Sequence, residues 1–197
     1  MKNSAGVFPV QFLAAFLIAL AVLPSVNAQS QSGKDSKETP ITRKQVNSFT
    51  VIGISARTNN AREAGPDGVI GRQWQKVFQE GVLEKIPEKI GPVIYAVYTD
   101  YESDHNGAYT YVIGASVKEG VRPPAGMVAV TVPAGSFAVI TSDKGPLPQV
   151  VPATWHRVFQ LEDEHQLNRA YKTDFEVYDQ RAQNPQDAQV DLYLGVK

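Results

Sequence analysis

The stretch WQKVFQ at Trp74–Gln79 recurs as WHRVFQ at Trp155–Gln160, 81 residues further along the chain. Four of the six positions are identical, and the basic Lys76 is matched by the basic Arg157. In each copy Trp, Val and Phe stand at positions i, i+3 and i+4, which places them on one face of a helix. The stretch therefore predicts two helices of the same kind, each with one apolar face.

The similarity extends to the segments that follow the two helices. YAVY at Tyr95–Tyr98 corresponds to FEVY at Phe175–Tyr178 at a spacing of 80 residues, and Ile113-Gly114 corresponds to Leu194-Gly195 at a spacing of 81. Three matches at nearly constant spacing indicate a duplicated supersecondary unit, and such a duplication determines the fold class.

Each copy carries the same order of predicted elements. Runs of β-branched residues predict strands before each helix, and two more strands joined by a loop with turn residues follow it. The expected strands span about residues 49–56, 93–102, 108–118, 127–132, 135–142, 172–179 and 189–196, and the first helix spans about 70–83. This order predicts an α+β fold of duplicated β-α-β-β units, with an antiparallel sheet and the two main helices packed on one face.

The N-terminus has the pattern of a secretory signal peptide. Lys2 precedes twelve consecutive apolar residues, Phe12–Leu23, and the small residues Val26 and Ala28 precede a cleavage point. The apolar run is shorter than the roughly 20 residues of a bilayer-spanning helix. We therefore expect cleavage after Ala28, no stable membrane anchor, and a periplasmic or secreted protein; the alternative is a buried N-terminal helix.

The rest of the chain predicts one domain behind a leader. Residues 29–47 are polar and rich in Ser, Lys and Gln, which predicts a flexible segment. The domain is expected at 48–197, with repeat halves at about 48–120 and 121–197.

Composition excludes several classes of function. The 19 basic and 20 acidic residues give no electrostatic footprint for nucleic acid. The chain has no cysteine, which excludes disulfides, zinc–thiolate sites, iron–sulfur clusters and a cysteine nucleophile. The three histidines have no zinc-ligand spacing, so we expect neither a metal site nor a cofactor.

Only one copy of the repeat carries a particular acidic residue. The counterpart of Glu176 is Ala96. Side chains alternate along a strand, so Phe175 and Val177 share one face and Glu176 shares the other with Tyr178. We expect the helices to cover the apolar pair, and Glu176 to project onto the free concave face where the halves meet. The alternative is a solvated carboxylate on an exposed strand.

The paired helices, together with the segments Val97–Glu102, Asn106–Gly114 and Asp174–Tyr178, resemble the gyrase-inhibitor-like small-molecule-binding domain. This is the effector-binding module of AraC-type and multidrug-sensing bacterial regulators. The resemblance covers about Ser48–Lys197 and implies an aromatic-lined ligand cleft between two pseudo-symmetric halves, which accepts amphipathic or cationic organic molecules. It also implies that Glu176, which matches the glutamate of the family's F/Y-E-x-Y strand, lies in the pocket. Since no helix-turn-helix segment precedes the domain, we expect a freestanding, exported binder.

Physical chemistry agrees with the pocket that the resemblance implies. A buried carboxylate is costly when unpaired, an incoming cation compensates it, and tyrosine rings add cation–π attraction. We expect Trp74 and Trp155 in the core, because they belong to the apolar stripes of the helices. The expected ligand-binding residues are Glu176, Tyr178, Tyr95, Tyr111 and Tyr193.

Two other functions remain open. A hydrolase of reactive small molecules would use Glu176 to activate water, with Asp174 or Tyr178 assisting from the same face. A protein-interaction module would dock a partner chain on the cleft or on a sheet edge. We favour binding of a small organic ligand, with no catalytic residue assigned.

Overall fold

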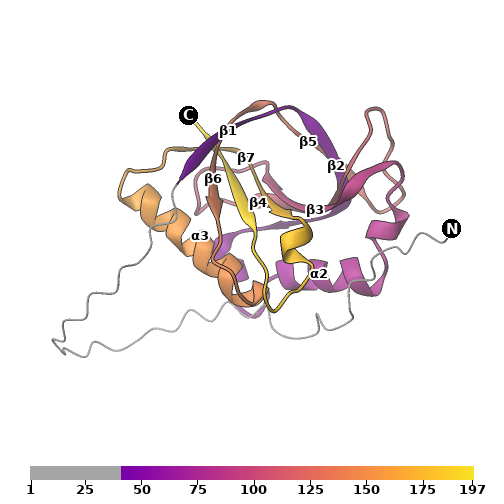
Figure 1. Ribbon diagram of the computed structural model, residues 1–197, viewed down its shortest axis with the longest axis horizontal. Coiled ribbons are helices and arrows are strands. Elements are labelled where there is room, and N and C mark those ends of the chain that lie inside the picture. Colours follow the sequence, from indigo (N-terminus) through magenta and orange to yellow (C-terminus); the bar gives the residue numbers. More distant parts are fainter. Residues whose placement is uncertain (1–40) are drawn as a thin grey trace.

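One antiparallel sheet with helices on one side forms the domain (Figure 1). The computed structural model describes residues 41–197, so the predicted signal peptide (1–28) and most of the predicted leader lie outside the described residues. The strands are β1 (Thr42–Val46), β2 (Phe49–Thr58), β3 (Lys89–Thr99), β4 (Tyr109–Val117), β5 (Val128–Val132), β6 (Gly135–Thr141), β7 (Arg169–Tyr178) and β8 (Asp191–Val196). The helices are α1 (Asn60–Glu63), α2 (Ile70–Gln79) and α3 (Leu147–Asp163), with short 3-10 turns η1 (Leu83–Lys85) and η2 (Gln180–Ala182).

The strand order confirms the duplication and shows how the copies interlock. The order is β1-β6-β8-β7-β3-β4-β2-β5. The counterparts in the two copies are β1 and β5, β2 and β6, β3 and β7, and β4 and β8. Each pair of counterparts lies at equal distances from the middle of this order, so a pseudo-twofold axis passes between β3 and β7. The first strand of each copy lies at the outer edge of the other copy, because β1 pairs with β6 and β5 pairs with β2. Each unit is therefore a β-α-β-β core with an additional, exchanged edge strand.

Part of the predicted flexible leader is an edge strand. Residues 42–46 form β1 and pair with β6 from Thr42↔Val139 to Val46↔Gly135. The prediction that the domain starts near Ser48 was wrong, because the first strand already begins at Thr42. Four of the five side chains of β1 are exposed, so backbone pairing holds the strand and no apolar pattern marks it. Arg43 and Lys44 give this edge the charge with which natural sheets discourage further pairing.

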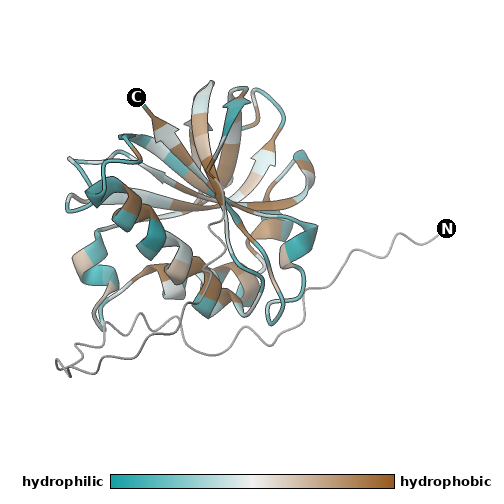
Figure 2. Ribbon diagram, turned by 60° about the vertical axis from the view of Figure 1, so that its left-hand side comes forward, coloured by the Kyte–Doolittle hydropathy of each residue, from teal (hydrophilic) through white to brown (hydrophobic). Residues whose placement is uncertain are grey.

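Helices α2 and α3 cover one face of the sheet, as expected, and they lie together on one side of it in Figure 2. Their apolar stripes, which include Trp74, Val77 and Val158, join one cluster with buried residues of the central strands. None of the helices within residues 41–197 has the length and apolarity needed to cross a membrane.

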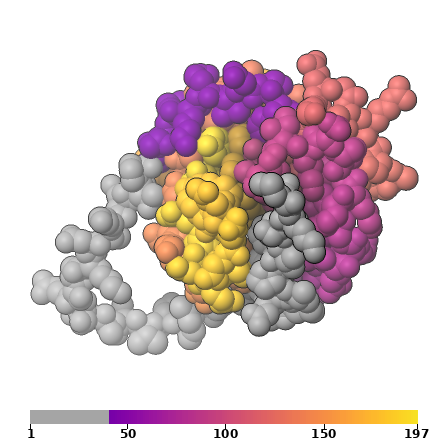
Figure 3. All heavy atoms as spheres, turned by 45° about the vertical axis from the view of Figure 1, so that its right-hand side comes forward, coloured from indigo at the N-terminus to yellow at the C-terminus, as the bar shows by residue number. Residues whose placement is uncertain are grey.

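The opposite face of the sheet is also buried, so the described residues form no free concave face of the expected kind. Every strand contributes an apolar side chain to a second cluster. The outer strands β1 and β5 lie across the molecule from the helices in Figure 1, and in Figure 3 the indigo residues that include β1 lie along the top of the molecule. Phe175 belongs to this cluster and is 3% exposed, and Val177 packs against it. The prediction that Phe175 and Val177 face the helices was therefore wrong. Because both faces of the sheet are buried, an apolar strand residue can lie on either face, and its apolarity does not show which face the helices cover.

The repeated glycines Gly114 and Gly195 have a steric reason. A Cβ atom on Gly195 would lie 2.7 Å from the carbonyl oxygen of Thr173, and one on Gly114 would overlap the carbonyl of Ile52. Both positions therefore require the absence of a side chain, which explains why the Ile/Leu-Gly pair is found in both copies.

Candidate functional site

Glu176 lies at the centre of the molecule, on the helical side of β7. Its cross-strand partner in β3 is Ala96. The residue is 1% exposed, so its carboxylate is closed off from solvent. Three side chains donate hydrogen bonds to it: Tyr98 Oη to Oε1 at 2.8 Å, Trp155 Nε1 to Oε1 at 2.6 Å, and Tyr178 Oη to Oε2 at 2.7 Å.

The donors come from both copies of the repeat. Tyr98 and Tyr178 are repeat counterparts, and each donates to a different oxygen of the same carboxylate. The tryptophans repeat the arrangement: Trp155 packs edge to face on Tyr98 with ring centroids 5.0 Å apart, and Trp74 packs on Tyr178 at 4.8 Å. The duplication thus builds a nearly symmetric aromatic enclosure around one asymmetric acid.

Burial inside the enclosure raises the pKa values of its own acidic side chains. Burial raises the pKa of Glu176, although the hydrogen bonds from Trp155, Tyr178 and Tyr98 oppose the rise. Burial, together with the charge of Glu176, raises the pKa of Tyr98 and of Tyr178 well above the ordinary tyrosine value. Both phenols therefore stay protonated and act as donors, and the carboxylate has no cation of the described chain against it.

The structure brings together some of the predicted ligand-binding residues. Tyr178 contacts Glu176 directly, and Tyr111 lies in the same cluster with its ring 5.1 Å from that of Tyr98. Tyr111 is fully buried, and its hydroxyl lies near Trp74 without a hydrogen bond of normal geometry.

The other two predicted tyrosines lie on the opposite face of the sheet. Tyr95 and Tyr193 pack against the second apolar cluster, where the Tyr193 ring stacks on Phe175 at 4.6 Å. They therefore do not surround Glu176. Each is one residue out of phase with the helical side, because alternate side chains of a strand point to opposite faces.

Sequence reasoning missed two of the three residues that donate hydrogen bonds to Glu176. Trp155 was expected only in the core; it does join the core cluster, but its indole N–H also reaches Glu176. Tyr98 was quoted in the repeat motif but not among the site residues. Its equivalence to Tyr178 across the repeat was the signal that could have identified it.

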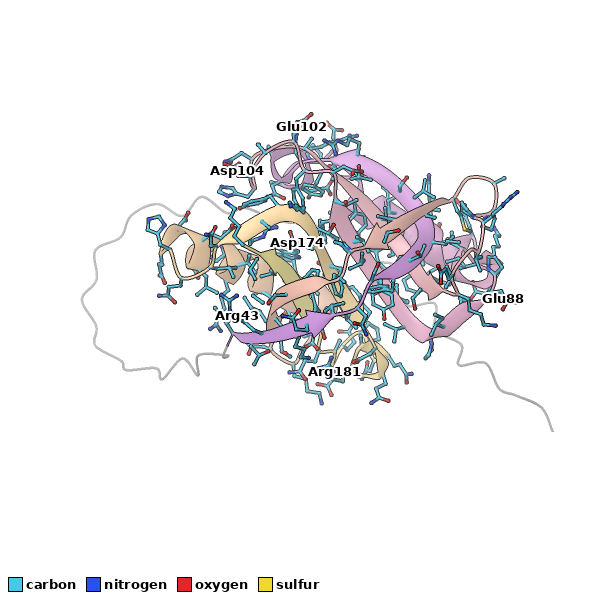
Figure 4. All side chains as sticks on the ribbon, turned by 90° about the horizontal axis from the view of Figure 1, so that it is seen from above. Arg43, Glu88, Glu102, Asp104, Asp174 and Arg181 are labelled. Carbon is cyan, nitrogen blue, oxygen red and sulfur yellow. The ribbon has the colours of Figure 1, made fainter. Side chains whose placement is uncertain are left out.

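Asp174, suggested as an assisting acid, has another role. It is fully buried and forms an ion pair with Arg169, while Tyr101 Oη donates to its Oδ2 at 2.7 Å. In Figure 4 Asp174 lies in the interior of the molecule, whereas Arg43, Glu88 and Glu102 lie near its periphery. With Arg169 bound to it, Asp174 is not free to assist Glu176.

The described part of the chain holds no group of three or more His, Asp or Glu side chains placed to bind a metal ion. The enclosure instead offers one buried acceptor surrounded by aromatic rings. An organic cation that displaced the phenol and indole donors would find the carboxylate and several ring faces.

Comparison with known families and proteins agrees with the fold. The family described as "Cass2: Integron-associated effector binding protein" matches residues 44–196. The match confirms the resemblance to the gyrase-inhibitor-like domain. Among proteins of similar sequence, YobU of Bacillus subtilis, named as a putative transcriptional regulator, is 34% identical over 147 residues, which cover 74% of this chain and 90% of YobU.

The transcriptional regulator BrlR of Pseudomonas aeruginosa is 35% identical over 150 residues, which cover 75% of this chain and 52% of BrlR, so the similarity spans only about half of that regulator. Two solved structures share the fold. The integron cassette protein from the mobile metagenome of Vibrio cholerae has a TM-score of 0.63 at 27% identity and covers 80% of this chain and 95% of its own. SAV2435, solved bound to tetraphenylphosphonium, has a TM-score of 0.66 at 22% identity over 80% of this chain and 94% of its own.

Proposed function

The chain belongs to the family of integron-associated effector-binding proteins, and from this premise we propose that it binds a lipophilic organic cation at Glu176. The observation that carries the proposal is the enclosure itself: a carboxylate that is 1% exposed and is surrounded by Tyr98, Tyr178 and Trp155.

Charge favours a cation over a neutral or anionic ligand. A buried carboxylate without a counter-ion has lost its hydration, and neutral donors compensate only part of that loss. A cation with its charge spread over aromatic groups loses little hydration on entry and gains the attraction of the carboxylate. Each suitably placed Tyr or Trp ring adds about 0.5–2 kcal/mol of cation–π attraction.

The closed state has to open for a ligand to enter. Trp155 is partly exposed, whereas Tyr98 and Tyr178 are buried. We place the entry at Trp155, because moving this side chain breaks one hydrogen bond to Glu176 and opens the partly exposed side of the enclosure.

The direct test uses two probes of the same shape and opposite charge. Tetraphenylphosphonium is the cation bound to SAV2435, and tetraphenylborate is its anionic counterpart. Isothermal titration of the purified protein is expected to show binding of the cation only. Glu176→Gln keeps the size of the side chain and removes its charge, so it is expected to weaken cation binding at least about tenfold, the loss expected for removing a buried counter-charge.

Asp191→Asn serves as the matched control. Asp191 is another buried carboxylate of the sheet, but it pairs with Arg181 and lies outside the enclosure. Cation binding should survive this change. Equal binding of both probes, or unchanged cation affinity in Glu176→Gln, would contradict the proposal. Ester hydrolysis that depends on Glu176 would support the hydrolase alternative.

We also propose that the protein acts outside the cytoplasm, without nucleic acid. The support is the pattern of Lys2, the apolar run Phe12–Leu23 and the residues before Ala28, together with the near-neutral charge of the chain. N-terminal sequencing of protein recovered from the periplasm or the medium should begin at Gln29. Recovery of the uncleaved chain in the cytoplasm would overturn the export proposal and leave the binding proposal unaffected.

A further inference from the structure

A second aromatic cage adjoins the enclosure, and it is already occupied by a cation of the protein. Arg169 is 3% exposed. Its guanidinium carbon lies 4.4 Å from the ring centre of Tyr171, 5.4 Å from that of Trp155 and 5.8 Å from that of Tyr101. Three rings around one guanidinium are the arrangement by which proteins bind organic cations.

Two carboxylates hold Arg169 in this cage. Its Nη2 pairs with Asp174, and its Nη1 pairs with Glu162 Oε2 at 3.1 Å. Although burial opposes the charge of Arg169, these carboxylates raise its pKa, so it stays charged. Two acids against one base leave the cluster with no excess positive charge to repel a cation at Glu176.

Comparison with the other copy indicates that the cage is a specific feature of β7. The strands β3 and β7 have the same register irregularity, between Lys89 and Ile94 in one and between Arg169 and Asp174 in the other. A residue with positive φ lies in each irregularity. These positions correspond at the repeat spacing of 80, so lysine, glycine and isoleucine stand where β7 has arginine, tyrosine and aspartate.

The tyrosine of the cage is held in a strained conformation. Tyr171 has φ of 50°, in the left-handed region, where its counterpart Gly91 has φ of 78°. A residue with a side chain costs about 1–2 kcal/mol more than glycine in this region. Such strain is typical of sites where a side chain is needed in one particular place. Here the Tyr171 ring covers Arg169, and its hydroxyl donates to Glu162.

Trp155 joins the cage to the enclosure. One face of its indole ring lies against Arg169, and its N–H donates to Glu176 Oε1. The Nε of Arg169 has no hydrogen-bond partner among the described residues, and Arg169 borders a polar cavity of about 350 Å³ together with Tyr171 and Lys197. The two ion pairs and the ring contacts together hold the guanidinium beside the indole.

We propose that Arg169 is a positioning residue for the cation site: its guanidinium, which lies over the Trp155 ring, holds the indole N–H on Glu176 and so determines the affinity for the cation. The effect of Arg169 on cation binding rests on the proposed function. The effect of Arg169 on the position of Trp155 does not, because it is present in the ligand-free protein. Lysine cannot replace arginine in this role, because its ammonium lacks the planar face that stacks on a ring.

The first test is made on the ligand-free protein. In ¹⁵N-labelled protein the two indole N–H signals are assigned with Trp155→Phe. Arg169→Lys is expected to move the Trp155 signal towards the position of a free indole and to speed its hydrogen exchange. Arg181→Lys, a change in an arginine whose ion pairs are with Asp179 and Asp191, should leave it in place. An unmoved Trp155 signal in folded Arg169→Lys would overturn the inference, whether or not any ligand binds.

The second test measures the dissociation constant of tetraphenylphosphonium in a double-mutant cycle. Arg169→Lys is expected to weaken binding about three- to tenfold, the range of a single cation–π contact. In a Trp155→Phe background the same change should have no further effect, because Arg169 acts through the indole. Equal effects in both backgrounds would overturn the inference. If the wild-type protein binds neither probe, the proposed function fails, and the indole signal alone decides the role of Arg169.

A second variant protects the test against misfolding. Tyr171→Gly installs the residue of the other copy and removes the left-handed strain, so the backbone is expected to be retained. Loss of the ring removes the shortest of the three ring contacts of Arg169 and the hydrogen bond to Glu162. The guanidinium should therefore shift, and the Trp155 signal should move in the same direction as in Arg169→Lys. Tyr171→Phe keeps the ring and should leave the signal unchanged. If the signal stays in place in folded Tyr171→Gly, the cage does not position the indole.

Discussion

Ala96 and Glu176, which are counterparts in the duplicated sequence, are also direct cross-strand partners in the central β3–β7 pair. The pseudo-twofold axis therefore passes between these two residues. The axis exchanges the pairs on either side of it: Tyr98 lies opposite Asp174, and their counterparts, Tyr178 and Ile94, lie opposite each other.

This geometry explains why the acid is present in one copy only. Directly opposed side chains in an antiparallel pair have Cβ atoms about 4.5–5.5 Å apart. Two carboxylates at that distance in a buried site would repel each other strongly. One glutamate opposite an alanine avoids the repulsion, and it lies on the axis, where Tyr98 and Tyr178 from the two copies both reach it.

A glutamate at position 96 should conflict with Glu176. Ala96 is fully buried, so Ala96→Glu places a second carboxylate opposite the first. We expect this single variant to be strongly destabilised. Ala96→Glu combined with Glu176→Ala should recover much of the lost stability, because only one acid remains on the axis. Urea denaturation of both variants measures the coupling; a double variant no more stable than Ala96→Glu would show that the two positions do not interact.

The stability of the protein should depend on pH through Glu176. Its pKa in the folded state is raised by burial above the ordinary value of 4.5. The folded state therefore holds a proton that the unfolded state releases, and the contribution of Glu176 to stability is greatest below pH 4.5 and falls as pH rises through the raised pKa. Glu176→Gln lacks this decrease and should be the more stable protein at neutral pH. Unfolding curves from pH 4 to 8 test this; a stability difference that does not grow with pH would contradict it.

The three buried tyrosines of the helical side should respond differently to loss of the hydroxyl. Tyr98→Phe and Tyr178→Phe each remove a donor to a buried carboxylate and should cost about 1–3 kcal/mol of unfolding free energy. Tyr111→Phe removes a hydroxyl without a normal hydrogen bond and should be neutral or stabilising. Thermal and urea denaturation compare them. A large loss in Tyr111→Phe would show that its hydroxyl does have a partner.

Removal of the partner of Arg169 should be far more costly than removal of a surface partner. Asp174→Ala leaves Arg169 buried without its closest counter-charge. We expect this variant to lose about 3–5 kcal/mol of unfolding free energy. Glu88→Ala breaks an ion pair with Lys118 in which both side chains are exposed, and it should leave the melting temperature unchanged. Calorimetric melting of the two variants makes the comparison. Similar losses in both would indicate that burial of the Arg169 pair contributes nothing.

Two glycines should differ in why they resist substitution. Gly91→Ala meets no atom within 4 Å, so its cost is the left-handed backbone alone, about 1–2 kcal/mol. Gly195→Ala has ordinary backbone geometry, but its new Cβ would lie 2.7 Å from the Thr173 carbonyl oxygen. Since the backbone at Gly195 or at Thr173 must shift to relieve this contact, we expect Gly195→Ala to lose more unfolding free energy than Gly91→Ala. Chemical denaturation of both variants measures the difference, and the opposite order would contradict the steric explanation.

Much of the fold could be predicted because its signals are local. The apolar stripes of α2 and α3, the strand runs and the turns between them are properties of short segments, and the spacing of the repeat connects them into two copies. Strand β1 was missed because four of its five side chains are exposed. The exchange of β1 and β5 between the copies could not be predicted either, because the sequence of one strand does not determine which strand it pairs with.

The candidate site was predicted in its centre and missed in its surroundings. Glu176 and Tyr178 were identified from one strand, but alternation assigned them to the wrong side of the sheet. The reason is that both faces of the sheet are buried, so Phe175 and Glu176 are both interior residues on opposite sides. Tyr95 and Tyr193 were included without assignment to a face; both lie on the same side of the sheet as Phe175 and therefore point away from Glu176.

The sequence by itself determined the duplication, the order of the elements and the presence of an acid in one copy only, because residue identity and short-range periodicity carry this information. Tertiary structure decided that the acid lies on the pseudo-twofold axis facing the helices, that Trp155 reaches it, and that the Arg169 guanidinium lies over that indole. These relations join residues far apart in the chain. They follow from the burial of both faces of the sheet and from the register of β3 against β7, which arise only when the whole domain packs.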